Sequence, residues 1–277
     1  MNIQILKKII ILTCICSVLV GCTSKGKEED NHNNFVPEVF GAELQNIECT
    51  VYKDGGEKPV NFYFVSKINI PNNSGIDLEY KGGNFEYSYT IEMGESSIED
   101  YSTYVISFDL KNFVFEAEKI TIDKIKINYE QGKSLEIVPQ KFIINYVEGD
   151  YNNDDLLFYG SPLSIPYEMK EFPFELGSKQ ELTLKKVLIS NTSLKYQNES
   201  ENNNKVITSN NTNISLRFSS SDDILSKYTQ YLTSIVFFYE VNGKEYVRMT
   251  PSVSITYNSL FNYKDNFKLY YEEVLRE

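Results

Sequence analysis

Apolar and polar side chains alternate with a period of two along most of the chain from Phe35 onward. Such alternation is typical of strands that bury one face and expose the other. The clearest runs lie in residues 60–70, 85–92 and 104–110. Their predicted core-facing side chains are Phe62, Phe64, Ile68, Ile70, Phe85, Tyr87, Tyr89, Ile91, Tyr104, Ile106, Phe108 and Leu110. The pattern predicts short antiparallel strands and an all-β fold.

The alternation slips by one residue at Asp123-Lys124. Ile120 and Ile122 share one phase, whereas Ile125 and Ile127 share the other. One extra residue in a strand produces this change of phase, because it re-aims every later side chain. The sequence therefore predicts a β-bulge at this point.

One hairpin pattern occurs twice. Gly132 and Gly243 each mark a turn, a proline follows, and a tyrosine lies about fourteen residues after each glycine, at Tyr146 and Tyr257. Glu43-Leu44 and Glu181-Leu182 could be a second, looser correspondence. The repetition suggests two related β-units.

A cluster of turn formers and acids at residues 148–155 suits a boundary between these units. We expect two tandem antiparallel β-sandwiches, immunoglobulin-like in the broad sense, at residues 35–148 and 155–277. A single larger sandwich or barrel is the alternative. Helix is compatible with only two segments, 222–232 and 266–276, and the second could equally contain a strand.

The first 22 residues have the layout of a secretory signal. Lys7 and Lys8 precede an apolar run from Ile9 to Val20 that is too short to span a bilayer. The motif Leu19-Val20-Gly21-Cys22 resembles the lipobox of bacterial lipoproteins. This resemblance implies removal of residues 1–21, diacylglycerol on the Cys22 thiol and an acyl chain on its amino group. The expected location is the outer side of a bacterial membrane, with polar residues 22–34 as a tether.

Charge and composition exclude several functions. The chain has 27 Lys and Arg against 39 Asp and Glu, a net charge of −12, and no concentrated basic run, which argues against nucleic-acid binding. His32 is the single histidine and lies in the tether, so a Ser-His-Asp triad or a His-rich zinc site is not expected. Cys49 alternates with Ile47 and Val51 and is expected to be a buried thiol.

Asp150, Asn152 and Asp154 have the alternating oxygen side chains of a calcium-binding loop. Asp155 stands where that loop needs glycine, and Ser161 stands where it needs a bidentate glutamate. A solvated linker is therefore the preferred interpretation, and these three residues are only weak metal candidates.

Two pairs of acids, Glu116 with Glu118 and Glu99 with Asp100, have the residue types of a glycosidase. Glu116 and Glu118 are more simply explained as the wet face of a strand. Tyrosines could form an exposed patch for a partner, although tyrosine is also a common strand residue. The candidate tyrosines for such a patch are Tyr63, Tyr257, Tyr263, Tyr270 and Tyr271.

No catalytic or cofactor-binding residue is predicted. The leading hypothesis is a non-catalytic binding or accessory module of the cell envelope that is held to the membrane by its lipid and contacts a protein or glycan. The alternatives are a structural spacer in an envelope complex and a carboxylate-based envelope enzyme such as a glycosidase.

Overall fold

The computed structural model describes residues 38–53, 56–95, 100–159, 164–166, 171–197, 199–208, 212–219, 228–256 and 269–275. All of them belong to one compact unit, Val36–Glu277. The predicted signal segment, Cys22, the tether and His32 lie outside the described residues.

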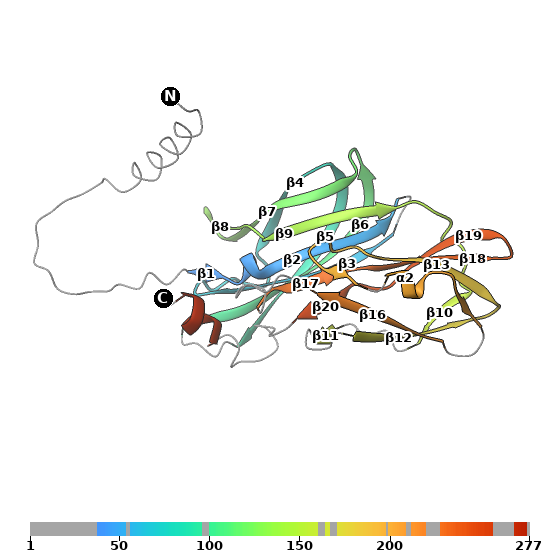
Figure 1. The fold of residues 1–277 in the computed structure, drawn as a ribbon. Helices are drawn as coiled ribbons and strands as arrows, with labels where there is room; N and C mark the ends of the chain where they lie inside the picture. Colours follow the sequence, from blue (N-terminus) through green and yellow to red (C-terminus); the bar gives the residue numbers. More distant parts are fainter. Residues whose placement is uncertain are drawn as a thin grey trace, which may run out of the picture. The chain divides into compact units, whose positions relative to one another are not determined.

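The predicted all-β fold is confirmed (Figure 1). In the first half of the chain, one sheet has the order β1-β3-β6-β5. Its strands are β1 (Val39–Phe40), β3 (Lys58–Ser66), β6 (Ser102–Phe115) and β5 (Gly83–Glu95). All its pairings are antiparallel, with Phe62 opposite Ile106 and Tyr89 opposite Phe108.

The facing sheet of the first half has the order β2-β9-β7-β4, and β8 pairs with β7. Its strands are β2 (Gln45–Tyr52), β9 (Lys141–Val147), β7 (Lys119–Glu130), β4 (Gly75–Lys81) and β8 (Lys133–Ile137), and β2 follows a short helix, η1 (Ala42–Leu44). β2 runs parallel to β9. Apart from β2 and β8, these strands have the order of an immunoglobulin-like sandwich. The sheet β1-β3-β6-β5 corresponds to A-B-E-D, and β4-β7-β9 corresponds to C-F-G.

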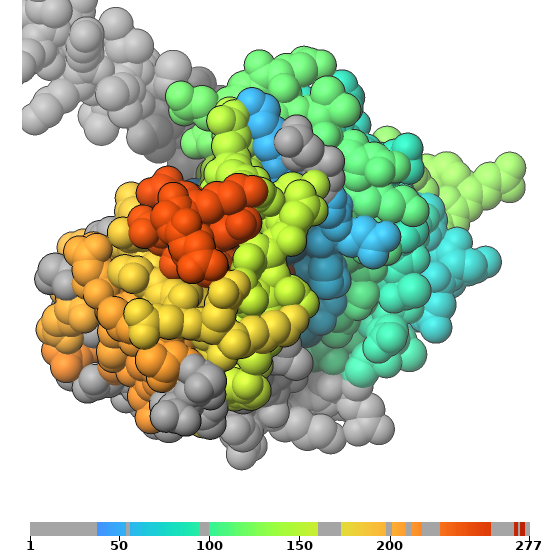
Figure 2. Space-filling model, turned by 90° about the vertical axis from the view of Figure 1, so that its right-hand side faces the viewer, coloured from blue at the N-terminus to red at the C-terminus, as the bar shows by residue number. Residues whose placement is uncertain are grey.

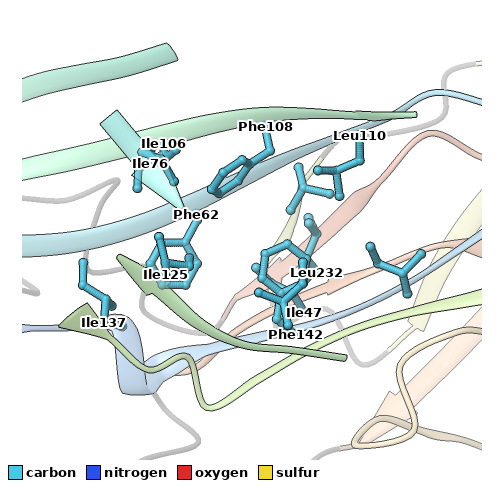
Figure 3. Packing of buried hydrophobic residues seen from close by; sticks show 14 of the residues in the cluster. Ile47, Phe62, Ile76, Ile106, Phe108, Leu110, Ile125, Ile137, Phe142 and Leu232 are labelled. Atoms are coloured by element: carbon cyan, nitrogen blue, oxygen red, sulfur yellow. The ribbon is translucent and has the colours of Figure 1, made fainter. Parts of the chain in front are cut away.

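The core of this sandwich lies between its two sheets, and Figure 3 shows side chains of both sheets pointing toward one another. Phe62 and Phe108 from one sheet meet Ile125 and Phe142 from the other, and each of them is at most 1% exposed. Alternation along each strand delivers these side chains to one face, so their burial supplies the hydrophobic stabilisation of the sandwich.

The predicted bulge is confirmed. Glu79 pairs with Lys124 and Tyr80 pairs with Ile122, so Asp123 has no residue opposite it. Because of this extra residue, Ile122 and Ile125 both reach the core although they differ in phase.

The second half repeats this arrangement. One sheet has the order β10-β12-β16-β14, and the facing sheet has the order β15-β13-β18-β19. The strands are β10 (Leu156–Tyr159), β12 (Glu171–Ser178), β16 (Thr212–Ser219), β14 (Lys195–Tyr196), β15 (Lys205–Ile207), β13 (Leu182–Ile189), β18 (Ile235–Val241) and β19 (Lys244–Met249), with a short helix α2 (Glu199–Asn202). A separate cluster, which includes Leu184, Leu216 and Phe237, fills this sandwich.

The two repeated turns hold equivalent places. Gly132 joins β7 to β8 and Gly243 joins β18 to β19, with φ of 76° and 79°. Glycine suits both because a left-handed backbone is strained for other residues. The looser correspondence between Glu43-Leu44 and Glu181-Leu182 is wrong, because the strand after the first, β2, pairs parallel with β9, whereas β13 pairs antiparallel with β18.

Three further strands join the two sandwiches. β17 (Gln230–Thr233) pairs antiparallel with β20 (Val253–Thr256) and parallel with β2, and β11 (Ser164–Pro166) pairs parallel with β20 (Figure 1). Among the described strands, this gives one continuous eight-stranded sheet that contains strands of both halves. The sandwiches are therefore joined edge to edge within a sheet. The predicted boundary at 148–155 lies between β9 and β10.

The helix considered for residues 222–232 is wrong at its described end, because Gln230–Thr233 is strand β17. Tyr231 packs in the second core and Leu232 packs in the first. Successive strand residues point to opposite faces, so an extended β17 supplies both cores at once, whereas one turn of helix could not.

The C-terminal segment packs against the first sandwich. Tyr270 and Val274, at the helical turns that include η3 (Tyr271–Leu275), lie in a third cluster with Phe40, Leu44 and Tyr101. Helix and strand were both compatible with residues 266–276, and the described part, residues 269–275, is helical. Within the described residues, no helix combines the length and the apolar character needed to cross a membrane.

Candidate functional site

The seam, which we define as the ladder between β2 and β17 with the polar residues beside it, is centred on Glu48. The Glu48 side chain is 5% exposed and forms an ion pair with Lys141 on β9. It also accepts hydrogen bonds from the backbone nitrogen and the hydroxyl of Thr192, both at 2.8 Å, and from Asn145 at 3.3 Å. Burial alone would raise the pKa of Glu48, but the hydrogen bonds from Lys141 and Thr192 hold it below its usual value.

Further polar contacts cross the seam on both sides of Glu48. The Asn191 amide donates to the backbone oxygen of Asn46 at 3.0 Å and to that of Leu232 at 3.2 Å. The hydroxyls of Thr50 and Ser190 are 2.6 Å apart. Because these groups are buried and hydrogen-bonded, separating the sandwiches would leave them without partners or expose them to water. The seam therefore holds the two sandwiches as one body.

A pocket of about 440 Å³ opens beside the seam. Three segments line it: the end of β2, the start of β3 and the connection from β19 to β20. The lining residues are Thr50, Val51, Tyr52, Gly56, Glu57, Lys58, Pro59, Met249, Thr250, Pro251 and Ser252. Both sandwiches contribute to it, and its shape is fixed by two contacts between them: Met249 N donates to the Tyr52 hydroxyl at 3.2 Å, and the Ser252 hydroxyl donates to Pro59 O at 3.2 Å.

Lys58 is the lysine among the residues that line this pocket. The residue is 5% exposed, and burial lowers the pKa of its amine. Its Nζ donates to Ser234 Oγ at 2.7 Å, and the same oxygen accepts from Thr50 N at 3.2 Å. No carboxylate of the described residues pairs with Lys58. Buried lysines without a counter-charge are uncommon and point to functional sites.

The sequence reasoning missed Lys58, although the signal was present. Lys58 shares the phase of Val60, Phe62 and Phe64, all of which face the core. A lysine on the apolar phase of a strand indicates either a strand end that reaches solvent or a buried cation. Only the tertiary structure around the lysine distinguishes a solvent-exposed strand end from a buried cation.

The weak metal candidates lie in the connection between β9 and β10. Asp150 pairs with Lys244 at 2.7 Å and accepts from Asn152 N at 3.0 Å, while Asp154 pairs with Lys179. Figure 2 shows the orange-red β18–β19 hairpin against the yellow-green segment around Asp150. Each carboxylate thus has its own lysine. Across the described part of the chain, no three His, Cys, Asp or Glu side chains are grouped as metal ligands.

The remaining candidates are placed as follows. Glu116 and Glu118 are exposed in the bend between β6 and β7, so their assignment to the face of a strand is wrong. Asp100 is exposed, and Glu99 lies outside the described residues. Cys49 is 0% exposed, as expected, and burial raises the pKa of its thiol.

The tyrosines do not gather as one described patch. Tyr270 is 1% exposed and donates to Glu43 at 2.8 Å, so it belongs to the third cluster and not to an exposed surface. Tyr63 is partly exposed on β3. Tyr257, Tyr263 and the side chain of Tyr271 lie outside what the structure describes.

A scan against models of known protein families gives no match, and a search of curated proteins gives none. Among solved structures, the chain is similar to zebrafish RET cadherin-like domains 1 to 4, with 6% identity and a TM-score of 0.26. The alignment covers 79% of this chain and 50% of that one, so this chain spans about half of its length. That similarity is too low to carry an argument, and the sandwich assignment here rests on strand order.

Proposed function

We propose that this protein is a lipid-anchored lipoprotein on the outer side of a bacterial membrane, where it acts as a non-catalytic binding or accessory module of the cell envelope. The Leu-Val-Gly-Cys motif ending at Cys22 supports the anchor. The pocket between the sandwiches, with buried Lys58 in its lining, is the observation that carries the binding role.

The seam supports a binding role because it gives the pocket a fixed shape. β2 and β17 share a backbone ladder, and buried side chains bond across it. A pocket formed in advance binds with less loss of conformational entropy than one that must be assembled on binding. Recognition of a group on a protein or glycan partner, or of a free small molecule, would use this site.

Binding is favoured over catalysis by the acids available in the pocket. Glu57 is the one carboxylate among the described lining residues. Glycoside hydrolysis by the usual mechanism needs two carboxyl groups on opposite sides of the bond. The spacer alternative is less favoured, because a spacer needs no pocket with a buried lysine in its lining.

The anchor is tested by replacing Cys22 with serine and fractionating the cells. We expect the protein to leave the membrane fraction, because one serine cannot carry the thioether-linked lipid. Unchanged attachment would contradict the proposed anchor.

The binding role is tested by a fragment screen with ligand-observed NMR. Ser252→Phe places a ring in the pocket, while Ser134→Phe adds the same ring at an exposed position on β8. We expect fragments that bind the wild-type chain and Ser134→Phe but not Ser252→Phe, with circular dichroism confirming that both variants fold. No bound fragments, or equal binding to all three chains, would refute the role of this pocket.

A further inference from the structure

We infer that the pocket beside the seam binds a small carboxylate with an apolar tail, whose carboxylate contacts Lys58 Nζ and whose tail lies against Val51, Pro59 and Pro251. This inference rests on the proposed binding function and names the ligand class for the same pocket.

The first argument is the hydrogen-bonding capacity of Lys58. An ammonium group has three N–H donors, and here one donor meets Ser234 Oγ. The other two have no acceptor among the described residues. A carboxylate beside Lys58 Nζ would accept hydrogen bonds from the remaining donors and supply a counter-charge, which offsets the cost of burying the ammonium.

The second argument is the position of Ser234. Its Oγ accepts from both Thr50 N and Lys58 Nζ. Thr50 N belongs to β2 and Ser234 follows β17, so the seam itself fixes the lysine. A cation in a fixed position favours ligands whose anionic group can reach it. It also makes one end of the pocket polar.

The third argument is the rest of the lining. Val51, Pro59, Met249 and Pro251 present aliphatic surface, and Tyr52 adds an aromatic ring whose hydroxyl is engaged by Met249 N. A volume of about 440 Å³ lies in the lower part of the range for small-molecule sites. A ligand with one anionic end and an apolar body matches both the cation and the walls.

The test compares octanoate with 1-octanol, which has the same tail without the charge. The protein is the mature chain, residues 22–277, with Cys22→Ser so that no lipid competes for apolar sites. It contains every residue of the three described cores. By isothermal titration calorimetry we expect octanoate to bind at least about tenfold more tightly than 1-octanol, because only octanoate neutralises the buried ammonium.

Two variants assign the difference to Lys58. Lys58→Met keeps the apolar stem and removes the charge, so we expect it to bind octanoate no more tightly than 1-octanol. Lys53→Met removes an exposed lysine that pairs with Glu148 close to the end of β2, and we expect it to keep the preference. A preference for octanoate that survives in Lys58→Met would overturn the inference.

A second measurement needs no variant. In wild-type protein with labelled lysine side chains, octanoate should shift one lysine resonance that 1-octanol leaves in place. Equal binding of both probes, or no such shift, overturns the carboxylate inference while leaving a binding pocket. Binding of neither probe overturns the inference, and only the fragment screen then decides whether the pocket function stands.

Discussion

Glu48→Gln is the most direct test of the seam. The substitution keeps the size of the side chain but removes the charge that faces Lys141 and Thr192. Lys141 then keeps a charge at a site where its side chain is 20% exposed, with a neutral amide in place of its partner. Hydrogen bonds to a charged group are worth about 1.5 to 3 kcal/mol each.

Breaking a buried ion pair from one side typically costs about 3 to 5 kcal/mol. We expect a loss near the lower end, about 3 kcal/mol, because the amide oxygen can still accept from Thr192 and because Lys141 reaches some solvent. The free energy of unfolding is measured by urea denaturation, followed by the fluorescence of the tyrosines.

The matched control is Glu148→Gln. Glu148 also pairs with a lysine, Lys53, but its side chain is 64% exposed, so we expect a change of less than about 1 kcal/mol. If Glu48→Gln costs less than about 1 kcal/mol, or no more than the control, the charge on Glu48 does not stabilise the seam and the reasoning fails.

The same pair of proteins gives a pH dependence. The folded-state pKa of Glu48 is below its ordinary value of 4.5, so the unfolded state binds more protons as the pH falls. The stability that Glu48 supplies is therefore full above about pH 4.5 and is lost as the pH falls through the lowered pKa. The difference between wild type and Glu48→Gln should shrink in acid, and a difference that grows there would contradict the ion-pair explanation.

Three further predictions concern other parts of the molecule. Lys58→Met should raise the free energy of unfolding by about 1 kcal/mol or more at pH 7, because it removes a buried charge without a carboxylate partner. Since burial lowers the pKa of Lys58, wild type gains stability as the pH rises toward 10.5, and the gap between the two proteins should narrow between pH 7 and 10 in urea denaturation; a widening gap would contradict this. Leu232→Ala should cost about 2 to 5 kcal/mol, because a side chain from β17 is lost from the first core, and a cost near zero would show that β17 does not pack there. Calcium should leave the melting temperature unchanged, because lysines already pair with Asp150 and Asp154, and a rise of several degrees would contradict that placement.

Local patterns in the sequence were sufficient for the strands and for some of their irregularities. Alternation in residues 104–110 gave the correct core face of β6, and the change of phase at Asp123 gave the bulge in β7. The placement of Gly132 and Gly243 in equivalent turns was also readable, because a left-handed backbone favours glycine wherever it occurs.

The sequence patterns did not predict burial where a segment distant in the sequence covers a side chain. Glu48 stands between Ile47 and Cys49, so alternation alone would put it on the solvent-facing side of the strand. In the structure the segment around Thr192, about 140 residues later, covers that face and turns an apparent surface acid into a buried one. Lys58 was missed for a similar reason, because the sequence does not show that residues 249–252 close over the start of β3.

The amino-acid sequence by itself determined the all-β class, the repeated hairpin and the buried phase of most strands, since these depend on side chains two residues apart on one extended backbone. The tertiary structure alone decided that β17 pairs with β2 and that Glu48 and Lys58 are buried at the resulting seam. Backbone ladders between distant strands are formed by peptide groups that every residue carries, so no local pattern of side chains specifies which two edges meet.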